Sequence, residues 1–275
     1  MKRKLKRIEA TDETLKSLSE SNILETRFGK EKLQTFLLSD LTHLYFYYYN
    51  CESVDDSGWG CAWRSLQSAL RFQLSLNNQK KDISFYTLFT KYGNKSTLIE
   101  IYKKMNKDKE DINNIVDILT KKNFAPHDNS SGWAEPFISQ LTLYDFGFKG
   151  DLILVNDYPK RSYAPKEVFE KTVDFVAFKE ILKQHFEQKN PGPIILDDSQ
   201  VSIAVIGIKF NTNNIIELII MDPHANTQPE IGFYIITLDE NGKGLEINPP
   251  NYVLASWKIY FNENKPWMVY IPKNN

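Results

Sequence analysis

Short apolar runs rich in β-branched residues are gathered in the C-terminal half of this 275-residue chain, and they restrict its fold more than any other feature. Each run has the length of one strand and is bounded by turn-forming residues. The runs are Leu152 to Val155, Pro193 to Leu196, Ser202 to Phe210, Ile215 to Met221, Phe233 to Leu238 and Met268 to Ile271. The two runs that flank the Asn-Thr-Asn-Asn segment at 211–214 predict an antiparallel hairpin.

The N-terminal half shows helical spacing instead. Apolar residues follow Cys61 at intervals of three or four, at Trp63, Leu66, Leu70 and Leu74, which predicts a core-facing helix that begins at or beside Cys61. Further helices are predicted around 112–119 and 175–186 and, from a less regular pattern, within 130–145. Helices followed by strands predict an α+β domain, with a helical N-terminal part packed on a mainly antiparallel sheet.

The first 28 residues differ in composition from the rest. They are polar and charged, and they open with a basic cluster at Lys2, Arg3, Lys4, Lys6 and Arg7. We predict a flexible basic extension over 1–28, which is either a solvated tail or a localisation or docking signal. Residues 29–275 contain no repeat and no long linker, so they are predicted to form one domain of catalytic size.

Composition excludes several classes of protein. A hydrophobic content of 41% supports a sizeable core, which excludes a disordered chain, and 34 basic against 35 acidic residues give a net charge of -1, which disfavours nucleic acid as a partner. Two cysteines and four scattered histidines fit neither a disulfide framework nor a thiolate zinc site, and no cofactor is expected. No apolar stretch approaches the roughly 18 residues of a membrane span, so we expect a cytoplasmic protein without membrane insertion.

Cys61 is the first candidate for chemistry. It follows Gly58-Trp59-Gly60, whose glycines permit a tight backbone approach just before the predicted helix. A helix N-terminus lowers a thiol pKa from about 8.5 toward neutrality, and its free N–H groups can hold an oxyanion. We therefore predict that Cys61 is a nucleophile; the alternative is a small buried residue at a helix start.

A thiolate nucleophile needs an imidazole base and a group that orients the ring, and Asp222-Pro223-His224 supplies both. In an extended strand residues i and i+2 share a face, so Asp222 and His224 are predicted to be neighbours, with the site at a strand end. Such a triplet is a weak signal alone. Together with Cys61 and the order of helices and strands it indicates a papain-type arrangement with the chain order Cys, Asp, His.

Two motifs of the chain resemble those of the cysteine proteases specific for the ubiquitin-fold modifier, the deUFMylating peptidases. The segment D-D-S-G-W-G-C-A-W-R-S-L-Q at 55–67 nearly reproduces the nucleophile segment of that family, and D-P-H at 222–224 reproduces its second motif. The resemblance implies a papain-like fold and a thiol peptidase and isopeptidase that processes the modifier precursor and removes the modifier from conjugated proteins. It also implies a monomer in the cytoplasm, with recruitment to the nucleus or the endoplasmic reticulum surface through partners.

The same resemblance assigns roles to individual residues. It implies Cys61 as nucleophile, His224 as base, Asp222 as the orienting carboxylate and Tyr49 as a donor in the oxyanion hole. Tyr49 also belongs to an aromatic cluster at 45–49 that would equally suit a core. Gln67, two helical turns after Cys61, is predicted to point into packing or to support the segment, and it is given no catalytic role.

Residues for substrate recognition are less sharply marked. Trp59 and Trp63 flank Cys61 and could wall a narrow channel for a glycine tail, although core packing is an equal alternative for Trp63. Asp197 and Asp198 stand where the family usually has a glycine-rich run, and this departure bears on recognition of the substrate tail.

The autophagin cysteine proteases, which also carry G-W-G-C and D-P-H, provide an alternative. Trp133-Ala134-Glu135-Pro136 resembles their W-x-x-P motif, and Gln228-Pro229 resembles their Q-P after the histidine. Asp55-Asp56 and the segment 64–67 favour the deUFMylating family. The alternatives are therefore a protease for an autophagy modifier, or a catalytically weak module that only binds a modifier.

Overall fold

The structure of the protein is a computed structural model that describes residues 17–81, 83–129, 131–211, 215–225, 229–247 and 265–273. The basic cluster at the N-terminus and Gln228 lie outside these residues, as do the central residues of the predicted hairpin turn.

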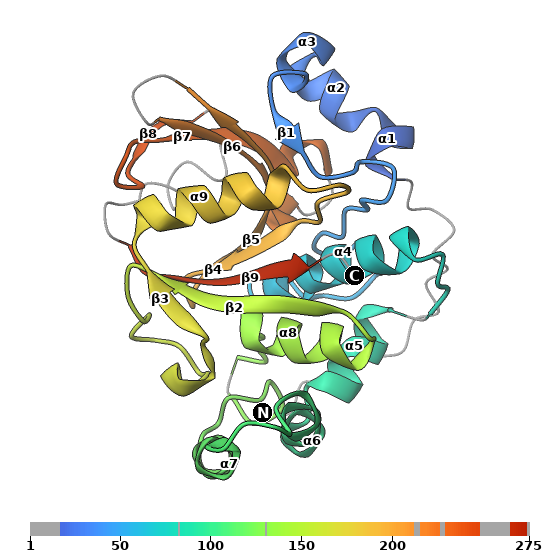
Figure 1. The fold of residues 1–275 in the computed structure, drawn as a ribbon. Coiled ribbons are helices and arrows are strands. Elements are labelled where there is room, and N and C mark those ends of the chain that lie inside the picture. The colour runs from blue at the N-terminus through green and yellow to red at the C-terminus, as the bar shows by residue number, and fades with distance from the viewer. Residues whose placement is uncertain are drawn as a thin grey trace.

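A mixed, mostly antiparallel sheet is the centre of the described structure (Figure 1). Its order is β3-β2-β9-β4-β5-β6-β7-β8, with β1 on β5, and the β2–β3 pair is parallel. The strands are β1 (Leu37–Leu38), β2 (Lys149–Val155), β3 (Lys171–Val173), β4 (Ile194–Asp197), β5 (Ser202–Phe210), β6 (Ile216–Met221), β7 (Phe233–Leu238), β8 (Gly244–Ile247) and β9 (Trp267–Lys273). The six predicted strands and the antiparallel pairing of β5 with β6 are confirmed.

Both faces of the sheet are covered, because alternate residues of a strand point to opposite sides. In β4, Ile194 and Leu196 pack in the core cluster that contains α9 (Phe175–Phe186), whereas Ile195 packs in the cluster on the other face. That second cluster contains α4 (Cys61–Leu76) and α8 (Pro136–Asp145). Figure 1 shows α9 on one side of the sheet, and α4 and α8 on the other.

Three further helices follow α4 in the described N-terminal part. They are α5 (Phe85–Tyr92), α6 (Lys95–Met105) and α7 (Ile112–Lys121). Ser84 and Asn94 cap α5 and α6 by accepting hydrogen bonds from backbone N–H groups in the first turn, as N-cap residues do. The α+β prediction and the start of a helix at Cys61 are confirmed. Within the ranges given above, no helix combines the length and the apolar character that a bilayer crossing requires.

The predicted extension over 1–28 needs correction for residues 17–28. These residues form α1 (Leu18–Ser21) and α2 (Ile23–Phe28), followed by α3 (Lys30–Leu33), and Ser17 closes a capping box at α1. Leu18 and Leu24 are buried in a cluster on the sheet with Phe233 of β7, so the sparse leucines of this segment suffice to anchor it. The prediction that this part is loosely held is wrong.

Candidate active site

Cys61 is the first residue of α4, and its side chain is fully buried. The chain reaches it through a tight turn in which Gly58 has a φ of +79°, a conformation that favours glycine. A Cβ on Gly60 would lie 2.3 Å from Oδ2 of Asp56, so this position has no room for a side chain. The turn therefore brings the thiol to the N-terminus of a helix, next to the first free backbone N–H groups.

A buried ion network ties this turn to α4. Arg64, which is fully buried, donates from Nε to Oδ2 of Asp56 at 2.7 Å and from Nη1 to the carboxylate of Glu52. Gln67 accepts from Nη1 of Arg64 at 2.8 Å and donates to Oε2 of Glu52 at 2.9 Å, which confirms its predicted supporting position. Asp56 also accepts from the backbone N–H of Asn50 at 2.9 Å, so one network fixes both ends of the turn.

The Asp222 and His224 side chains meet, but not in the predicted way. β6 ends at Met221, and Pro223–Ala225 form a 3₁₀ turn, so the prediction that the two residues share a strand face is wrong. Oδ1 of Asp222 accepts from the backbone N–H of His224 at 2.9 Å and contacts Nδ1 of its ring at 2.5 Å. The short carboxylate folds the chain back on itself, as aspartate does in turns.

The charges of this pair favour a carboxylate beside an imidazolium. Burial raises the pKa of Asp222, but His224 and the Tyr234 hydroxyl, which donates to Oδ2 at 2.9 Å, bring it below its ordinary value. Burial lowers the pKa of His224, whereas Asp222 and the neighbouring Cys61 raise it well above its ordinary value. The imidazole can therefore hold a proton next to the thiol.

Tyr49 completes the group. Its ring packs edge-on against the His224 ring with 5.0 Å between centroids, and its backbone N–H donates to the Pro223 carbonyl at 2.9 Å. Its buried hydroxyl lies next to Cys61 and makes no well-aligned hydrogen bond to any described residue. Burial and then Cys61 raise the pKa of Tyr49, so the phenol keeps its proton and remains a donor beside the thiol.

Trp133 also reaches this group, although no role in the site was predicted for it. It forms a small buried cluster with Tyr49 and Cys61, and Nε1 of its indole has no partner among the described residues. The Asn129 amide fixes the loop, accepting from Gly132 N–H at 2.7 Å and donating to the Trp133 carbonyl at 2.9 Å. The W-x-x-P motif was the only sequence signal for this position.

Two buried carboxyl groups adjoin the site. Glu135 accepts from the backbone N–H groups of Tyr163 and Ala164, both at 2.8 Å, and burial raises its pKa to about 7. Burial, then Glu135 and Cys61, raise the pKa of Asp197 well above its ordinary value, whereas its neighbour Asp198 pairs with Lys265 at 2.5 Å. The two consecutive aspartates therefore differ: Asp197 interacts electrostatically with the thiol, whereas Asp198 forms an ion pair with Lys265.

The two predicted channel tryptophans lie in the interior. Trp63 is fully buried, and its Nε1 donates to the Gly132 carbonyl at 3.1 Å, so of its two alternatives the structure favours core packing. Trp59 is 4% exposed and packs edge-on against Phe85 with 5.4 Å between ring centroids. Neither ring stands on the surface.

The side chains that meet here form a set suited to acyl transfer. They provide a thiol at a helix N-terminus, an imidazole, a carboxylate that orients it and a phenol donor. The described residues contain no group of three or more His, Cys, Asp or Glu side chains arranged to hold a metal ion.

Comparisons with known proteins place these residues in a family context. The sequence profile of peptidase family C78 matches residues 39–123 and 164–242, which together make up more than half of the chain and include Tyr49, Cys61, Asp222 and His224. Among solved structures, "Crystal structure of UfSP from C.elegans" is similar with a TM-score of 0.48 and 14% sequence identity. The alignment covers 84% of this chain and 33% of that one, so the chain spans about a third of the length of the C. elegans protein. No curated protein matches the sequence.

Proposed function

The chain belongs to peptidase family C78, a family of cysteine proteases, and on that premise we propose that it is a peptidase and isopeptidase for the ubiquitin-fold modifier. The observation that carries the proposal is the meeting of the buried Cys61 thiol with the Asp222–His224 pair and the Tyr49 hydroxyl, which lies beside the thiol. The near-identity of residues 55–67 to the nucleophile segment of the deUFMylating peptidases supports the choice of modifier.

In this mechanism the Cys61 thiol gives its proton to His224, and the sulfur attacks the carbonyl carbon of the modifier's terminal glycine. The negative charge that develops on the carbonyl oxygen is held by the Tyr49 hydroxyl and the Cys61 backbone N–H. The protonated His224 donates its proton to the leaving amine as the C–N bond breaks, which leaves a thioester on Cys61. His224 then takes a proton from water, whose oxygen attacks the thioester and releases the modifier with a free carboxylate.

Asp222 acts through His224 and not on the substrate. Its contact with Nδ1 directs Nε2 away from the carboxylate, and its charge stabilises the imidazolium. Asp197 and Trp133 lie next to the thiol and are placed to shape the space that a glycine tail would enter.

The proposal is tested with modifiers that carry a C-terminal electrophile. The wild-type chain should form a covalent adduct with the ubiquitin-fold modifier probe, Cys61→Ala should form none, and Cys51→Ala should react normally. A folded wild-type chain that forms no adduct would be a binding module. Comparison of kcat/KM for precursors of the ubiquitin-fold modifier, ubiquitin and an autophagy modifier then measures specificity. Preference for the autophagy modifier would change the proposed substrate and leave the proposed mechanism unchanged.

Thiol labelling provides a test that needs no substrate. Burial raises the pKa of Cys51 to about 11, so only about one part in 10,000 of it is thiolate at pH 7. Cys61 is less exposed than Cys51, but it has His224 as a neighbour. We expect iodoacetamide to label Cys61 faster between pH 6 and 7, as mapped by mass spectrometry; faster labelling of Cys51 would contradict the proposed nucleophile.

A further inference from the structure

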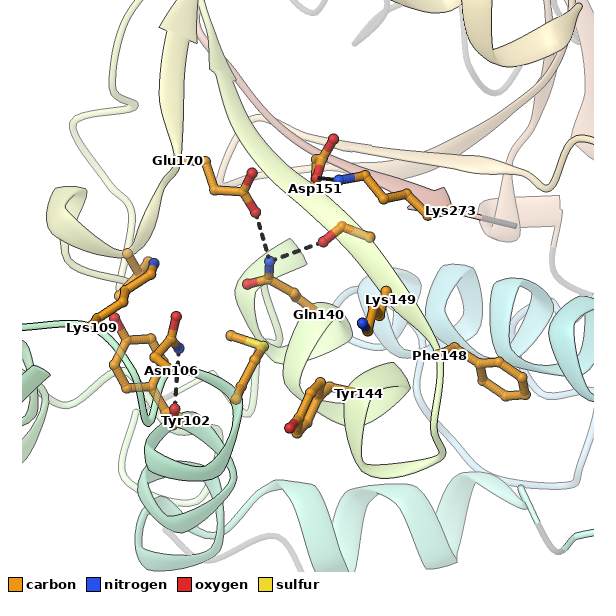
Figure 2. Close-up of a pocket in the computed structure, with 13 residues that line it drawn as sticks. Tyr102, Asn106, Lys109, Gln140, Tyr144, Phe148, Lys149, Asp151, Glu170 and Lys273 are labelled. Carbon is orange, nitrogen blue, oxygen red and sulfur yellow. Dashed lines mark hydrogen bonds and ion pairs between the residues drawn. The ribbon is translucent and has the colours of Figure 1, made fainter. Parts of the chain in front are cut away.

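A cavity lies away from the thiol. It is an open cavity with a volume of about 570 Å³, lined by residues at α6, α8, the start of β2, the segment before β3 and the end of β9 (Figure 2). Lys273, which lines the cavity, lies five positions along β9 from Met268, which pairs with Asp197 beside the active site. At about 3.4 Å per residue this is about 17 Å, so the cavity is a separate place on the molecule.

Gln140 gives the cavity an unpartnered acceptor. The side chain is 6% exposed, and its Nε2 donates to the Gly150 carbonyl at 3.2 Å and to Oε1 of Glu170 at 3.4 Å. Because both neighbours are acceptors, the amide cannot be turned around without losing these bonds. Its Oε1 is left without a partner among the described residues, and Figure 2 shows this oxygen directed toward the side of the cavity formed by α6.

Two carboxyl groups stand beside this amide. Glu170 is exposed at the mouth and has no ion pair with a described residue, while Asp151 pairs with Lys273. Burial, followed by the neighbouring Asp151, raises the pKa of Glu170, as expected where two carboxylates share too little positive charge. A buried acceptor beside two carboxylates that share Lys273 favours a cationic group with several N–H donors.

The walls favour a planar cation. The rings of Tyr102 and Tyr144 line the cavity, and a guanidinium stacks on aromatic faces while its fork of N–H groups reaches acceptors in one plane. The lysines at 109 and 149 are exposed, so their ammonium groups can extend into solvent. Lys273 is already engaged by Asp151.

The adjoining strand edge indicates that the cation belongs to a polypeptide. β3 pairs with β2 only from Ile153 onward, so at Gly150, which pairs with Pro272 of β9 on one side, the other side of β2 lacks a strand neighbour. Gln140 donates to the Gly150 carbonyl on this side, and Glu170 binds Leu152 through its carboxylate, which accepts from the Leu152 N–H at 3.5 Å, and through its backbone N–H, which donates to the Leu152 carbonyl at 2.9 Å. An extended peptide beside this edge could place one side chain in the cavity.

We propose that the cavity is a binding site for an arginine side chain of a polypeptide partner, with its guanidinium held by Oε1 of Gln140 and the carboxylate of Glu170. The site does not depend on the proposed peptidase activity, since no residue that forms it adjoins Cys61.

The probe is the pentapeptide Ac-Gly-Gly-Arg-Gly-Gly-NH₂, titrated into the wild-type chain by calorimetry or by NMR shifts of ¹⁵N-labelled protein. We expect a dissociation constant of about 1 mM or lower. The citrulline peptide, which has the same shape and no charge, should bind at least tenfold more weakly, and so should the lysine peptide. Equal binding of arginine and citrulline peptides, or no binding of the arginine peptide, would overturn the proposal. Tighter binding of free agmatine than of the peptide would overturn the polypeptide source.

Substitutions in the cavity test whether it binds a positively or a negatively charged group. Glu170→Gln keeps the shape of the side chain and the acceptor for the Leu152 N–H. It should weaken binding of the arginine peptide about tenfold, because a charge-assisted hydrogen bond is lost. Lys273→Met releases Asp151 and should strengthen binding several-fold. Lys209→Met, which removes a lysine paired with Glu217 on the β5–β6 hairpin, should change nothing. Unchanged or weaker arginine binding by Lys273→Met would show that negative charge in the cavity does not hold the peptide, and it would refute the assignment.

Discussion

Cys61 and His224 lie side by side, but the two halves of the site are held by different chemistry. The cysteine turn is fixed by Arg64, which is fully buried between the carboxylates of Asp56 and Glu52. The histidine is fixed by one carboxylate, Asp222, which serves its backbone N–H and its ring at once. The first half uses a network of charges far from solvent, and the second uses a local turn next to a strand end.

This difference separates stability from rate. Breaking a buried ion pair leaves a charge without compensation, which costs about 3–5 kcal/mol of stability whatever the activity. Changing a carboxylate to an amide in a short turn keeps most hydrogen bonds and alters only which ring nitrogen carries the proton. Substitutions in the cysteine half should therefore unfold the protein, whereas substitutions in the histidine half should lower the catalytic rate of a protein that stays folded.

The largest effect is expected for Asp222→Asn. Asparagine keeps the shape but not the charge, so the imidazole is held in the wrong tautomer and kcat should fall by about 10⁴, or about 5.4 kcal/mol in the barrier. Modifier binding and the urea midpoint should change little. Asp239→Asn is the matched control, because Asp239 also accepts backbone N–H bonds in a turn, from Asn241 and Lys243, but far along the chain from the site. Activity near that of the wild type in Asp222→Asn would remove the basis of the comparison.

Arg64→Met should destabilise the fold by about 3–5 kcal/mol, since Asp56 and Glu52 would then lie buried without their cation. Urea unfolding measures this change. Lys91→Met breaks the more exposed pair with Asp145 at 2.8 Å and should cost no more than about 1 kcal/mol. If Arg64→Met were as stable as the control but inactive, the cysteine half would depend on Arg64 for geometry and not for stability.

Tyr49→Phe removes one hydroxyl from the space beside the thiol. If that hydroxyl donates to the oxyanion, kcat should fall by roughly 100- to 1,000-fold, about 2.7–4 kcal/mol, with little change in affinity for the modifier. Tyr45→Phe, in the same aromatic segment but stacked under Arg71, should stay close to the wild type. A Tyr49→Phe enzyme within a few-fold of wild-type rate would assign the ring to packing alone.

The strands were predictable because most are buried on both faces and read as apolar runs, as Ile194 to Leu196 shows. The short edge strand β3 at Lys171–Val173 carries no such run, and it depends on its pairing with β2. The helices at residues 17–28 escaped prediction because two buried leucines, Leu18 and Leu24, anchor them only through contacts distant in sequence.

The site shows the same division. Cys61, Asp222 and His224 belong to local motifs, so their types and order could be read from the sequence, but the strand-face relation assumed for Asp222 and His224 failed because the aspartate caps its own turn. Trp133 and Asp197 meet the thiol only through the packing of α8 and β4 against α4, and no local pattern encodes that meeting.

The smallest effect is expected for Tyr234→Phe, which tests how far the histidine half depends on Asp222 alone. The Tyr234 hydroxyl donates to Oδ2 of Asp222 at 2.9 Å and is one of the causes that lower the pKa of that carboxyl. Its loss should raise the Asp222 pKa, so the carboxylate becomes protonated at higher pH and the acidic limb of the kcat/KM profile moves toward neutrality, with about a tenfold lower rate at its plateau. The pH dependence of stability should shift in the same direction. A carboxyl group whose pKa is lower in the folded state than its value of about 3.9 in the unfolded state stabilises the fold above that pH, and this contribution is lost as the pH falls. The variant should therefore lose the contribution at a higher pH than the wild type. Tyr92→Phe removes an equivalent phenol donor, 2.8 Å from Asp145, and should leave the pH profile unchanged. A Tyr234→Phe profile that coincides with that of Tyr92→Phe would mean that Asp222 holds His224 without help, and that the histidine half is fixed by a single carboxylate after all.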